Sequence, residues 1–174
     1  MAQMINLVDG EGKRIGGIEK LEAHREGKMH EAFSVFVFND RGELLLQQRN
    51  PAKYHSGGLW TNTCCSHAEL DEPLEVAVHR RLKEEMGFDM ELTEPFPIHY
   101  QADVSNGLRE NEWDYIFFGY GNLVPEPDPE EVSDWKWMNM EELAADIASH
   151  PEHYTEWLKI ILKDERFTQR ATLK

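Results

Sequence analysis

Short hydrophobic runs in the first half of the chain predict β-strands. The run FSVFVF (33–38) is rich in Val and Phe, and the run ELLLQQR (43–49) follows it after the turn NDRG (39–42). Gly42 can take the positive φ that such a turn uses. A further short extended segment is expected at 59–67.

From residue 73 to residue 86 the apolar positions follow a helical spacing instead. One face of the predicted helix carries Leu74, Ala77, Val78 and Leu82. Asp71 is expected to cap the start of this helix, Pro73 fits its first turn, and Gly87 ends it. The chain therefore changes from strand to helix near its middle.

The second half predicts further strands and then helices. Strands are expected around 96–102, 113–120 and 134–138, and helices near 140–149 and 152–163. This order indicates an α/β (α+β) fold in which a mixed β-sheet is sandwiched between helices. With 174 residues, the chain suits a single domain, residues 1–174, with a core at about 30–165.

Composition and charge narrow the possible partners. The chain has 18 Lys and Arg against 33 Asp and Glu, a formal net charge of −15, which repels nucleic acid and anionic membrane surfaces. The N-terminus has no apolar signal core, and no apolar stretch is long enough to span a membrane. We therefore expect a cytoplasmic monomer that binds neither nucleic acid nor membrane. An anionic ligand would need a local group of cations or metal ions.

The two cysteines, Cys64 and Cys65, are adjacent in the sequence. Neighbouring Cα atoms are about 3.8 Å apart, closer than a disulfide usually allows. At least one thiol is therefore free, and it serves either as buried bulk or in chemistry.

The segment 66–88, SHAELDEPLEVAVHRRLKEEMGF, resembles the Nudix box. The positions that match are Glu72, Arg80, Leu82, Glu84, Glu85, Gly87 and Phe88. Two positions depart from the pattern, because Ser66 replaces the leading Gly and Arg81 replaces the first Glu of the metal-binding set. The alternative is an ordinary solvated helix face rich in Glu, Lys and Arg, which the spacing disfavours.

The chemistry of this helix follows from its spacing. Residues four apart share one helix face, and carboxylates placed in this way bind Mg²⁺. Arg81 places a cation where one carboxylate would stand, so we expect one Mg²⁺ at Glu85 and a guanidinium that pairs with phosphate. We also expect the site to lack water activation, and hence to bind a diphosphate without hydrolysing it.

Motifs outside this helix extend the resemblance. They are E-K-x-x-A-H, H-x-A-F, W-T-N-x-x-C-x-H, R-R-x-x-x-E-x-G and E-N-E, in this order between about residue 4 and residue 160. Together they closely resemble type 1 isopentenyl-diphosphate Δ-isomerase, a family with the Nudix fold. The resemblance implies interconversion of isopentenyl and dimethylallyl diphosphate, by protonation at C4 and proton loss from C2 through a carbocation-like intermediate in isoprenoid biosynthesis.

The resemblance also implies roles for individual residues. Cys65 occupies the position of the catalytic thiol, Glu112 that of the catalytic acid, and Tyr100 lies beside that acid. The implied ligands of one Mn²⁺ or Zn²⁺ are His24, His30, His67, Glu110 and Glu112. The implied diphosphate-binding cations are Lys20, Arg49, Lys53 and Arg81. Trp157 would cover the reacting carbon, and Glu85 would hold Mg²⁺ with the substrate.

The residue types fit these roles. Glu110 and Glu112 are two apart, so on an extended segment they face the same way, and imidazoles with carboxylates suit Zn²⁺ or Mn²⁺. The Cys65 thiolate can be generated near a basic, metal-rich site. Cys64 is taken as buried filler, and the histidines outside the motifs as ordinary surface or core residues, namely His79, His99, His150 and His153.

Two other functions are weighed against this one. A Nudix diphosphohydrolase of a nucleoside diphosphate derivative would need the Glu that Arg81 replaces, and it would not need Cys65. A non-enzymatic Nudix-fold module that binds a metal or a partner would be expected to lack catalytic positions, yet Cys65 and Glu112 are both present. The isomerase is therefore the favoured function.

Overall fold

Strand β3 (His30–Phe38) forms the centre of the fold and is buried along its whole length. In this computed structural model, which describes residues 2–172, β3 has four neighbours. It pairs antiparallel with β1 (Met4–Val8), β4 (Leu44–Arg49) and β6 (Cys64–Ser66), and in parallel with β8 (Arg109–Tyr120). The Val and Phe run predicted as a strand is therefore the fully buried strand of a mixed sheet.

The other strands extend the sheet outward from these. Strand β2 (Arg14–Glu19) pairs with β1, β7 (Phe96–Asp103) pairs with β8, and both β5 (Trp60–Thr61) and β9 (Val132–Met138) pair with β4. Within residues 2–172 the sheet has nine strands. The predicted mixed sheet is confirmed.

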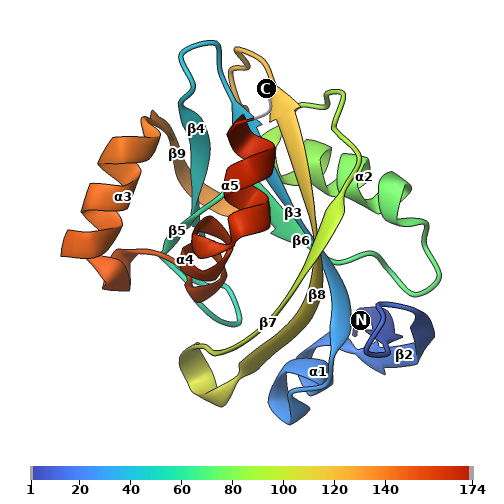
Figure 1. The fold of residues 1–174 in the computed structure, drawn as a ribbon. Helices are drawn as coiled ribbons and strands as arrows, with labels where there is room; N and C mark the ends of the chain where they lie inside the picture. Colours follow the sequence, from blue (N-terminus) through green and yellow to red (C-terminus); the bar gives the residue numbers. More distant parts are fainter. Residues whose placement is uncertain (1, 173–174) are drawn as a thin grey trace.

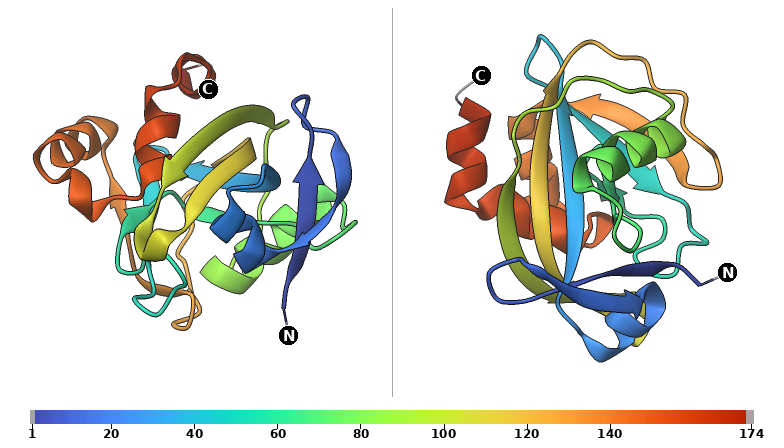
Figure 2. Two further views of the ribbon diagram at one scale, coloured as in Figure 1. Left: turned by 90° about the horizontal axis from the view of Figure 1, so that it is seen from below. Right: turned by 90° about the vertical axis from the view of Figure 1, so that its right-hand side faces the viewer.

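Helices cover both faces of the sheet. Helix α2 (Leu74–Met86) lies on one face, and α3 (Met140–Ser149), α4 (Glu156–Lys163) and α5 (Glu165–Thr172) lie on the other (Figures 1 and 2). The short α1 (Lys20–Glu26) lies with the β1–β2 hairpin at the lower end in Figure 1. This arrangement confirms the predicted sandwich of a sheet between helices.

Alternating residues of β3 supply the two cores. Phe36 and Phe38 pack with the buried faces of α3, α4 and α5, whereas Val35 and Val37 pack against α2. The predicted apolar face of α2 is buried there, with Ala77 fully enclosed. The period of two along the strand thus divides its side chains between two layers.

Three boundary predictions need correction. Strand β8 begins at Arg109 rather than near residue 113, so Glu110 and Glu112 lie within it. Asp71 is not the N-cap of α2: it lies in a left-handed turn with φ 63°, and Pro73 occupies the cap position. The last predicted helix begins at 156 rather than 152, because residues 151–153 form a short 3₁₀ turn and the Thr155 side chain caps α4. The sequence patterns also did not predict β1, β2, α1 or α5.

Among residues 2–172, the longest helix is α2 with 13 residues. No helix in this part of the chain is long and apolar enough to cross a bilayer.

Candidate active site

A cavity of about 50 Å³ lies near the N-terminal ends of β3 and β8. Cys65 and Glu112, the two predicted proton-transfer residues, both line it. The lining also includes the predicted Mg²⁺ ligand Glu85, the predicted metal ligands His67 and Glu110, and the aromatic Trp157. All four predicted cations line it as well, namely Lys20, Arg49, Lys53 and Arg81. The remaining predicted residues, His24, His30 and Tyr100, are buried behind this lining.

Strand register explains how residues far apart in the sequence meet here. In the parallel pair β3–β8, His30 lies opposite Glu112, and in the antiparallel pair β7–β8, Tyr100 lies opposite Glu112. On the other side of β3, Ser34 lies opposite Cys65. One central strand therefore fixes the thiol and the carboxylate in the same layer of side chains.

Glu112 is held by three side chains. Its Oε2 lies 2.9 Å from His30 Nε2 and 2.8 Å from His67 Nε2, and Tyr100 donates its hydroxyl proton to Oε1. Burial would raise the pKa of Glu112, but the hydrogen bonds from His30 and His67 outweigh it and lower the pKa well below its usual value. Burial, together with the charge of Glu112, raises the pKa of Tyr100 well above its usual value.

The histidine rings are oriented for ligation through their Nε2 atoms. His24 Nδ1 lies 2.7 Å from the Lys20 carbonyl oxygen, and His30 Nδ1 lies 2.9 Å from that of Lys28. Such a bond on one ring nitrogen leaves the other nitrogen free to bind a metal. One ligand atom from each of His24, His30, His67 and Glu112 can be chosen so that all lie within 4.8 Å of one another.

A second group overlaps the first. His24, Glu110 and His55 also offer ligand atoms within 4.8 Å of one another, and His55 was not among the predicted residues. His24 Nε2, His55 Nε2 and Glu110 Oε2 are buried without a hydrogen-bond partner. Unpaired buried polar atoms are costly, and imidazoles with carboxylates are a donor set for a divalent ion. The histidine cluster (His24, His30, His55, His67, Glu110 and Glu112) therefore fits a metal ion.

Cys65 is free, and side chains on two sides contact its sulfur. The thiol donates to Asn62 Oδ1 at 3.0 Å, and Trp157 Nε1 donates to Sγ at 3.1 Å. Burial and the nearby Asp114 raise the pKa of Cys65 to about 12, although the Trp157 hydrogen bond opposes this. Among the protein groups alone, desolvation therefore outweighs the nearby cations and opposes the thiolate. Cys64 is fully buried on the α2 side, as expected of a filler.

The four predicted cations lie together on the cavity and are called the cation clamp here (Lys20, Arg49, Lys53 and Arg81). Arg81 Nη2 donates to Glu85 Oε2 at 2.6 Å, and Arg81 Nε donates to Ser66 Oγ at 2.9 Å. Ser66 does not adopt a left-handed φ. The residue that replaces the leading Gly of the Nudix pattern therefore supplies a hydrogen bond to the residue that replaces its Glu.

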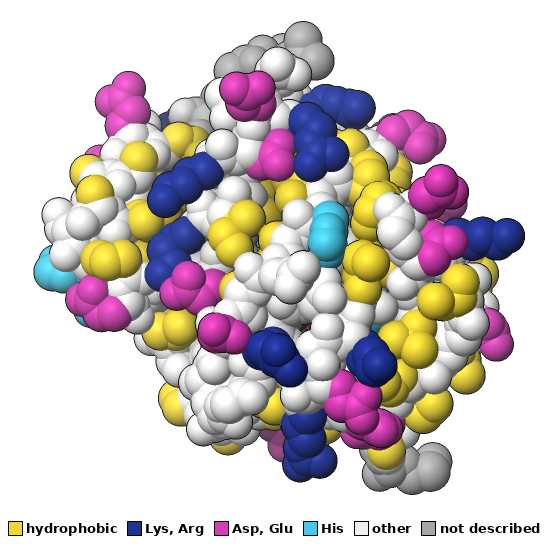
Figure 3. Space-filling model, turned by 60° about the horizontal axis from the view of Figure 1, so that its bottom comes forward, with side chains coloured by type: hydrophobic (Ala, Val, Ile, Leu, Met, Phe, Trp, Pro, Cys, Tyr) yellow, Lys and Arg dark blue, Asp and Glu magenta, His cyan; other side chains and the backbone are white. Residues whose placement is uncertain are grey.

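Carboxylates partly neutralise the clamp. Lys53 donates to Glu131 Oε2, which also lies 3.4 Å from Arg81 Nη2. Burial would raise the pKa of Glu131, but contact with Lys53 lowers it. For Lys20, burial and the nearby Lys53 and Arg81 lower the pKa. On the lower face of the molecule, Lys and Arg side chains lie among Asp and Glu side chains (Figure 3), so positive charge is local within an acidic protein.

Three residues near the cavity were missed. Asp114 is buried, accepts a hydrogen bond from Ser34, and follows Glu110 and Glu112 at the same period of two, a signal that could have identified it. His55 and Glu131 lie in loops, where no periodicity marks them. The four histidines taken as ordinary residues lie outside the cavity lining, namely His79, His99, His150 and His153.

Comparison with known proteins now adds to this geometry. The NUDIX domain family matches residues 28–158. The chain is 46% identical over 162 residues to an isopentenyl-diphosphate Delta-isomerase 2 of Photorhabdus laumondii, covering 93% of this chain and 92% of the relative. It is 43% identical over 164 residues to the isopentenyl-diphosphate Delta-isomerase of Serratia proteamaculans, covering 94% and 92%.

The chain belongs to the isopentenyl-diphosphate Δ-isomerase family. Membership of this Nudix isomerase family confirms the predicted enzyme class and favours it over the diphosphohydrolase. Solved structures support the fold alone. DR0079 from Deinococcus radiodurans superposes with a TM-score of 0.73 at 18% identity, covering 91% of this chain and 96% of that one. A MutT NUDIX hydrolase from Burkholderia pseudomallei gives 0.60 at 22% identity, covering 76% and 95%.

Proposed function

We propose that this isomerase-family chain interconverts isopentenyl and dimethylallyl diphosphate in isoprenoid biosynthesis, without breaking the phosphoanhydride. The observation that carries this proposal is that Cys65 and Glu112 line one cavity together with the cation clamp. The reaction needs a proton donor and a proton acceptor beside a five-carbon chain, and a grip on its diphosphate. Nothing in it requires the water activation that Arg81 disfavours.

The clamp anchors the substrate by its charged end. The guanidinium of Arg81 and the ammonium of Lys53 suit phosphate oxygens, because charge-assisted hydrogen bonds are the stronger ones. Mg²⁺ bound between Glu85 and the diphosphate would screen that carboxylate from the substrate. Arg49 has a buried guanidinium that lies 5.1 Å from the centre of the Trp157 ring. Arg49 therefore links the charged end of the cavity to its aromatic wall.

The apolar part of the cavity protects the cationic intermediate. The Trp157 ring is 3% exposed, and an aromatic face stabilises a desolvated cation by about 2 kcal/mol. Exclusion of water also prevents capture of the cation as an alcohol. Mn²⁺ or Zn²⁺ in the histidine cluster would supply positive charge that tunes the acidity of Glu112.

The resting protonation states suggest how the two residues divide the proton transfers. The thiol of Cys65 holds a proton, whereas the lowered pKa of Glu112 favours the carboxylate. Among the protein groups alone, these states place the proton for C4 on Cys65, with Glu112 accepting the proton from C2. The resemblance implies the opposite direction for the metal-loaded site, with Glu112 as the acid. The reaction is reversible, so each residue donates in one direction and accepts in the other.

Product analysis tests the function. Wild type should convert isopentenyl diphosphate into dimethylallyl diphosphate with no phosphate released, and Cys65→Ala and Glu112→Gln should each slow the conversion by about 100-fold or more. Cys64→Ala is the matched control and should keep it, because Cys64 faces the α2 core. Released phosphate with an unmoved double bond would favour a hydrolase, and unchanged rates in both variants would contradict the mechanism.

Exchange in heavy water distinguishes the two directions of proton transfer. If Cys65 donates to C4, Glu112→Gln should still exchange the C4 hydrogens of isopentenyl diphosphate with solvent, and Cys65→Ala should not. The opposite pattern would assign the acid to Glu112.

A cytoplasmic location and a monomeric state stay predictions. Cell fractionation tests the location, and light scattering tests the oligomeric state.

A further inference from the structure

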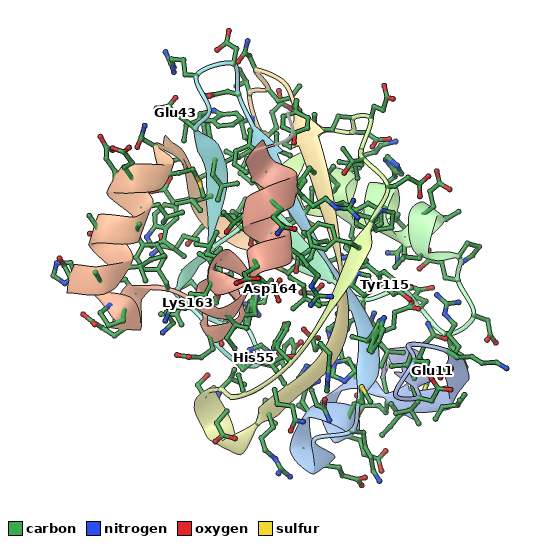
Figure 4. The ribbon with its side chains drawn as sticks, in the orientation of Figure 1. Glu11, Glu43, His55, Tyr115, Lys163 and Asp164 are labelled. Atoms are coloured by element: carbon green, nitrogen blue, oxygen red, sulfur yellow. The ribbon has the colours of Figure 1, made fainter. Side chains whose placement is uncertain are left out.

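His55 lies at the buried end of the loop between β4 and β5. Figure 4 labels it below α4 and beside the lower half of β7. The side chain is 2% exposed, and its Nδ1 lies 3.0 Å from Ser56 Oγ. Ser56 has a φ of 54° and donates its backbone N–H to Ser105 Oγ at 2.7 Å. A left-handed turn at Ser56, tied to a second loop, therefore accompanies the burial of this ring.

The other ring nitrogen of His55 lies at ion-pair distance from a carboxylate but does not have hydrogen-bond geometry with it. His55 Nε2 lies 2.6 Å from Glu110 Oε1, yet no hydrogen bond joins them and Nε2 is without a partner. His24 Nε2 lies 3.3 Å from the same oxygen and is also unpartnered, as is Glu110 Oε2. Donor atoms that lie close together without hydrogen bonds between them have the arrangement of ligands around a shared cation.

The two overlapping groups of ligands cannot each hold an ion through His24. His24 belongs to both groups, and its Nδ1 already contacts the Lys20 carbonyl oxygen, so Nε2 is its one free nitrogen. A single imidazole nitrogen binds one metal ion. The ring centroids follow one another at 5.3 Å from His55 to His24, 4.8 Å from His24 to His30 and 5.0 Å from His30 to His67. His24 therefore lies between His55 on one side and His30 and His67 on the other, and links the two groups.

We infer that His55 is a fourth histidine ligand, through Nε2, of the divalent ion in the histidine cluster. This inference rests on the proposed function and adds a donor to the five residues predicted for that site. Four imidazoles and two carboxylates supply six donors, which would leave no position for a water or the substrate. The ion would then act through its ligands, in contrast to catalytic sites that keep an open position.

X-ray absorption of the Zn²⁺-loaded chain counts the imidazole ligands directly. The experiment uses one equivalent of Zn²⁺ and a background with His150→Ala and His153→Ala, which removes the exposed group of His150, Glu152 and His153. Four imidazoles are expected in this background and three after His55→Ala. Three imidazoles in both proteins would overturn the inference and leave the proposed function intact. No bound Zn²⁺ in the background would contradict the metal site itself.

Affinity separates direct ligation from indirect support. Competition with a chelator should show more than about a 100-fold loss of Zn²⁺ affinity in His55→Ala, beyond the 10–100-fold typical of residues that only orient a ligand. His79→Ala, which removes a histidine paired with Asp89 outside the cavity lining, should keep the affinity within a few-fold. A loss below 10-fold in His55→Ala would overturn the inference. If His55→Ala does not fold, the imidazole count in the background alone decides.

Discussion

The histidine cluster and the cation clamp lie on the same cavity but are built differently. The cluster is buried, and strand register places Glu112 between His30 and Tyr100. The clamp is only partly buried, and its cations come from a helix start, a strand end, a loop and α2, with Glu85 and Glu131 as counter-ions. The histidine cluster is suited to fixing the geometry of proton transfer. The cation clamp is suited to exchanging a protein carboxylate for the diphosphate of a ligand.

This contrast predicts that damage to the cluster affects turnover and damage to the clamp affects binding. The largest effect is expected from Glu112→Gln, which removes a proton-transfer group and should lower kcat by about 10²–10⁴-fold. KM for isopentenyl diphosphate should change little because the clamp is untouched. Steady-state kinetics check this, with Glu130→Gln, an exposed carboxylate outside the cavity lining, as a control. A raised KM with an unchanged kcat in Glu112→Gln would contradict the assignment of turnover to the histidine cluster and of binding to the cation clamp.

The state of the thiol gives the next largest effect. With the pKa of Cys65 raised to about 12, the thiolate fraction at pH 8 should be roughly a thousandfold below that of an ordinary cysteine. The raised pKa means that the protonated form persists as pH rises, so reactivity should increase steeply only in strong alkali. Alkylation of metal-free Cys64→Ala, followed by mass spectrometry, measures it against a short cysteine peptide. Rapid labelling at pH 7 would contradict the desolvated thiol.

The clamp should respond in KM. Lys53→Met removes a cation whose side chain is 19% exposed, and a charge-assisted hydrogen bond contributes about 1.5–3 kcal/mol. We expect KM to rise about tenfold while kcat stays within about threefold. Lys13→Met, an exposed lysine outside the cavity lining, serves as the control. An equal fall in kcat with no change in KM would place Lys53 in the chemistry instead.

The smallest effect concerns the internal counter-ion. Glu131→Gln removes the carboxylate that pairs with Lys53 and lies near Arg81, so the diphosphate no longer has to replace it. KM should fall about two- to fivefold, and more at low salt because screening weakens such pairs. Titration with inorganic pyrophosphate at two ionic strengths checks this. Weaker pyrophosphate binding in the variant would show that Glu131 supports the clamp rather than competes with the ligand.

Sequence reasoning worked where a pattern repeats and failed where loops decide. The helical spacing of α2 gave a correct element, and the period of two correctly placed Glu110 and Glu112 on one face, because each pattern reports one buried face. The strand that holds both carboxylates begins at 109, earlier than the predicted 113. The partnership of His30 with Glu112 depends on β3–β8 pairing across 82 residues, which no local pattern records. The position of His55 depends on a left-handed turn at Ser56, and a serine in the sequence does not predict that backbone conformation.

The protonation state of Cys65 is harder to predict from the sequence than its position. The sequence shows which cations are present but not how deeply the sulfur is buried. Desolvation is the largest influence on its pKa and opposes ionisation, whereas Arg49 contributes less. Charge counts along a chain therefore give the composition of a site more reliably than its protonation state.

The central claim is that the site moves protons on the hydrocarbon end of a molecule held by its diphosphate. Incubation of wild type with isopentenyl diphosphate and Mg²⁺ in heavy water tests it most directly, read by mass spectrometry and a phosphate assay together. We predict deuterium in both isopentenyl and dimethylallyl diphosphate, with no phosphate released. Phosphate release from substrate that carries no deuterium would contradict the account.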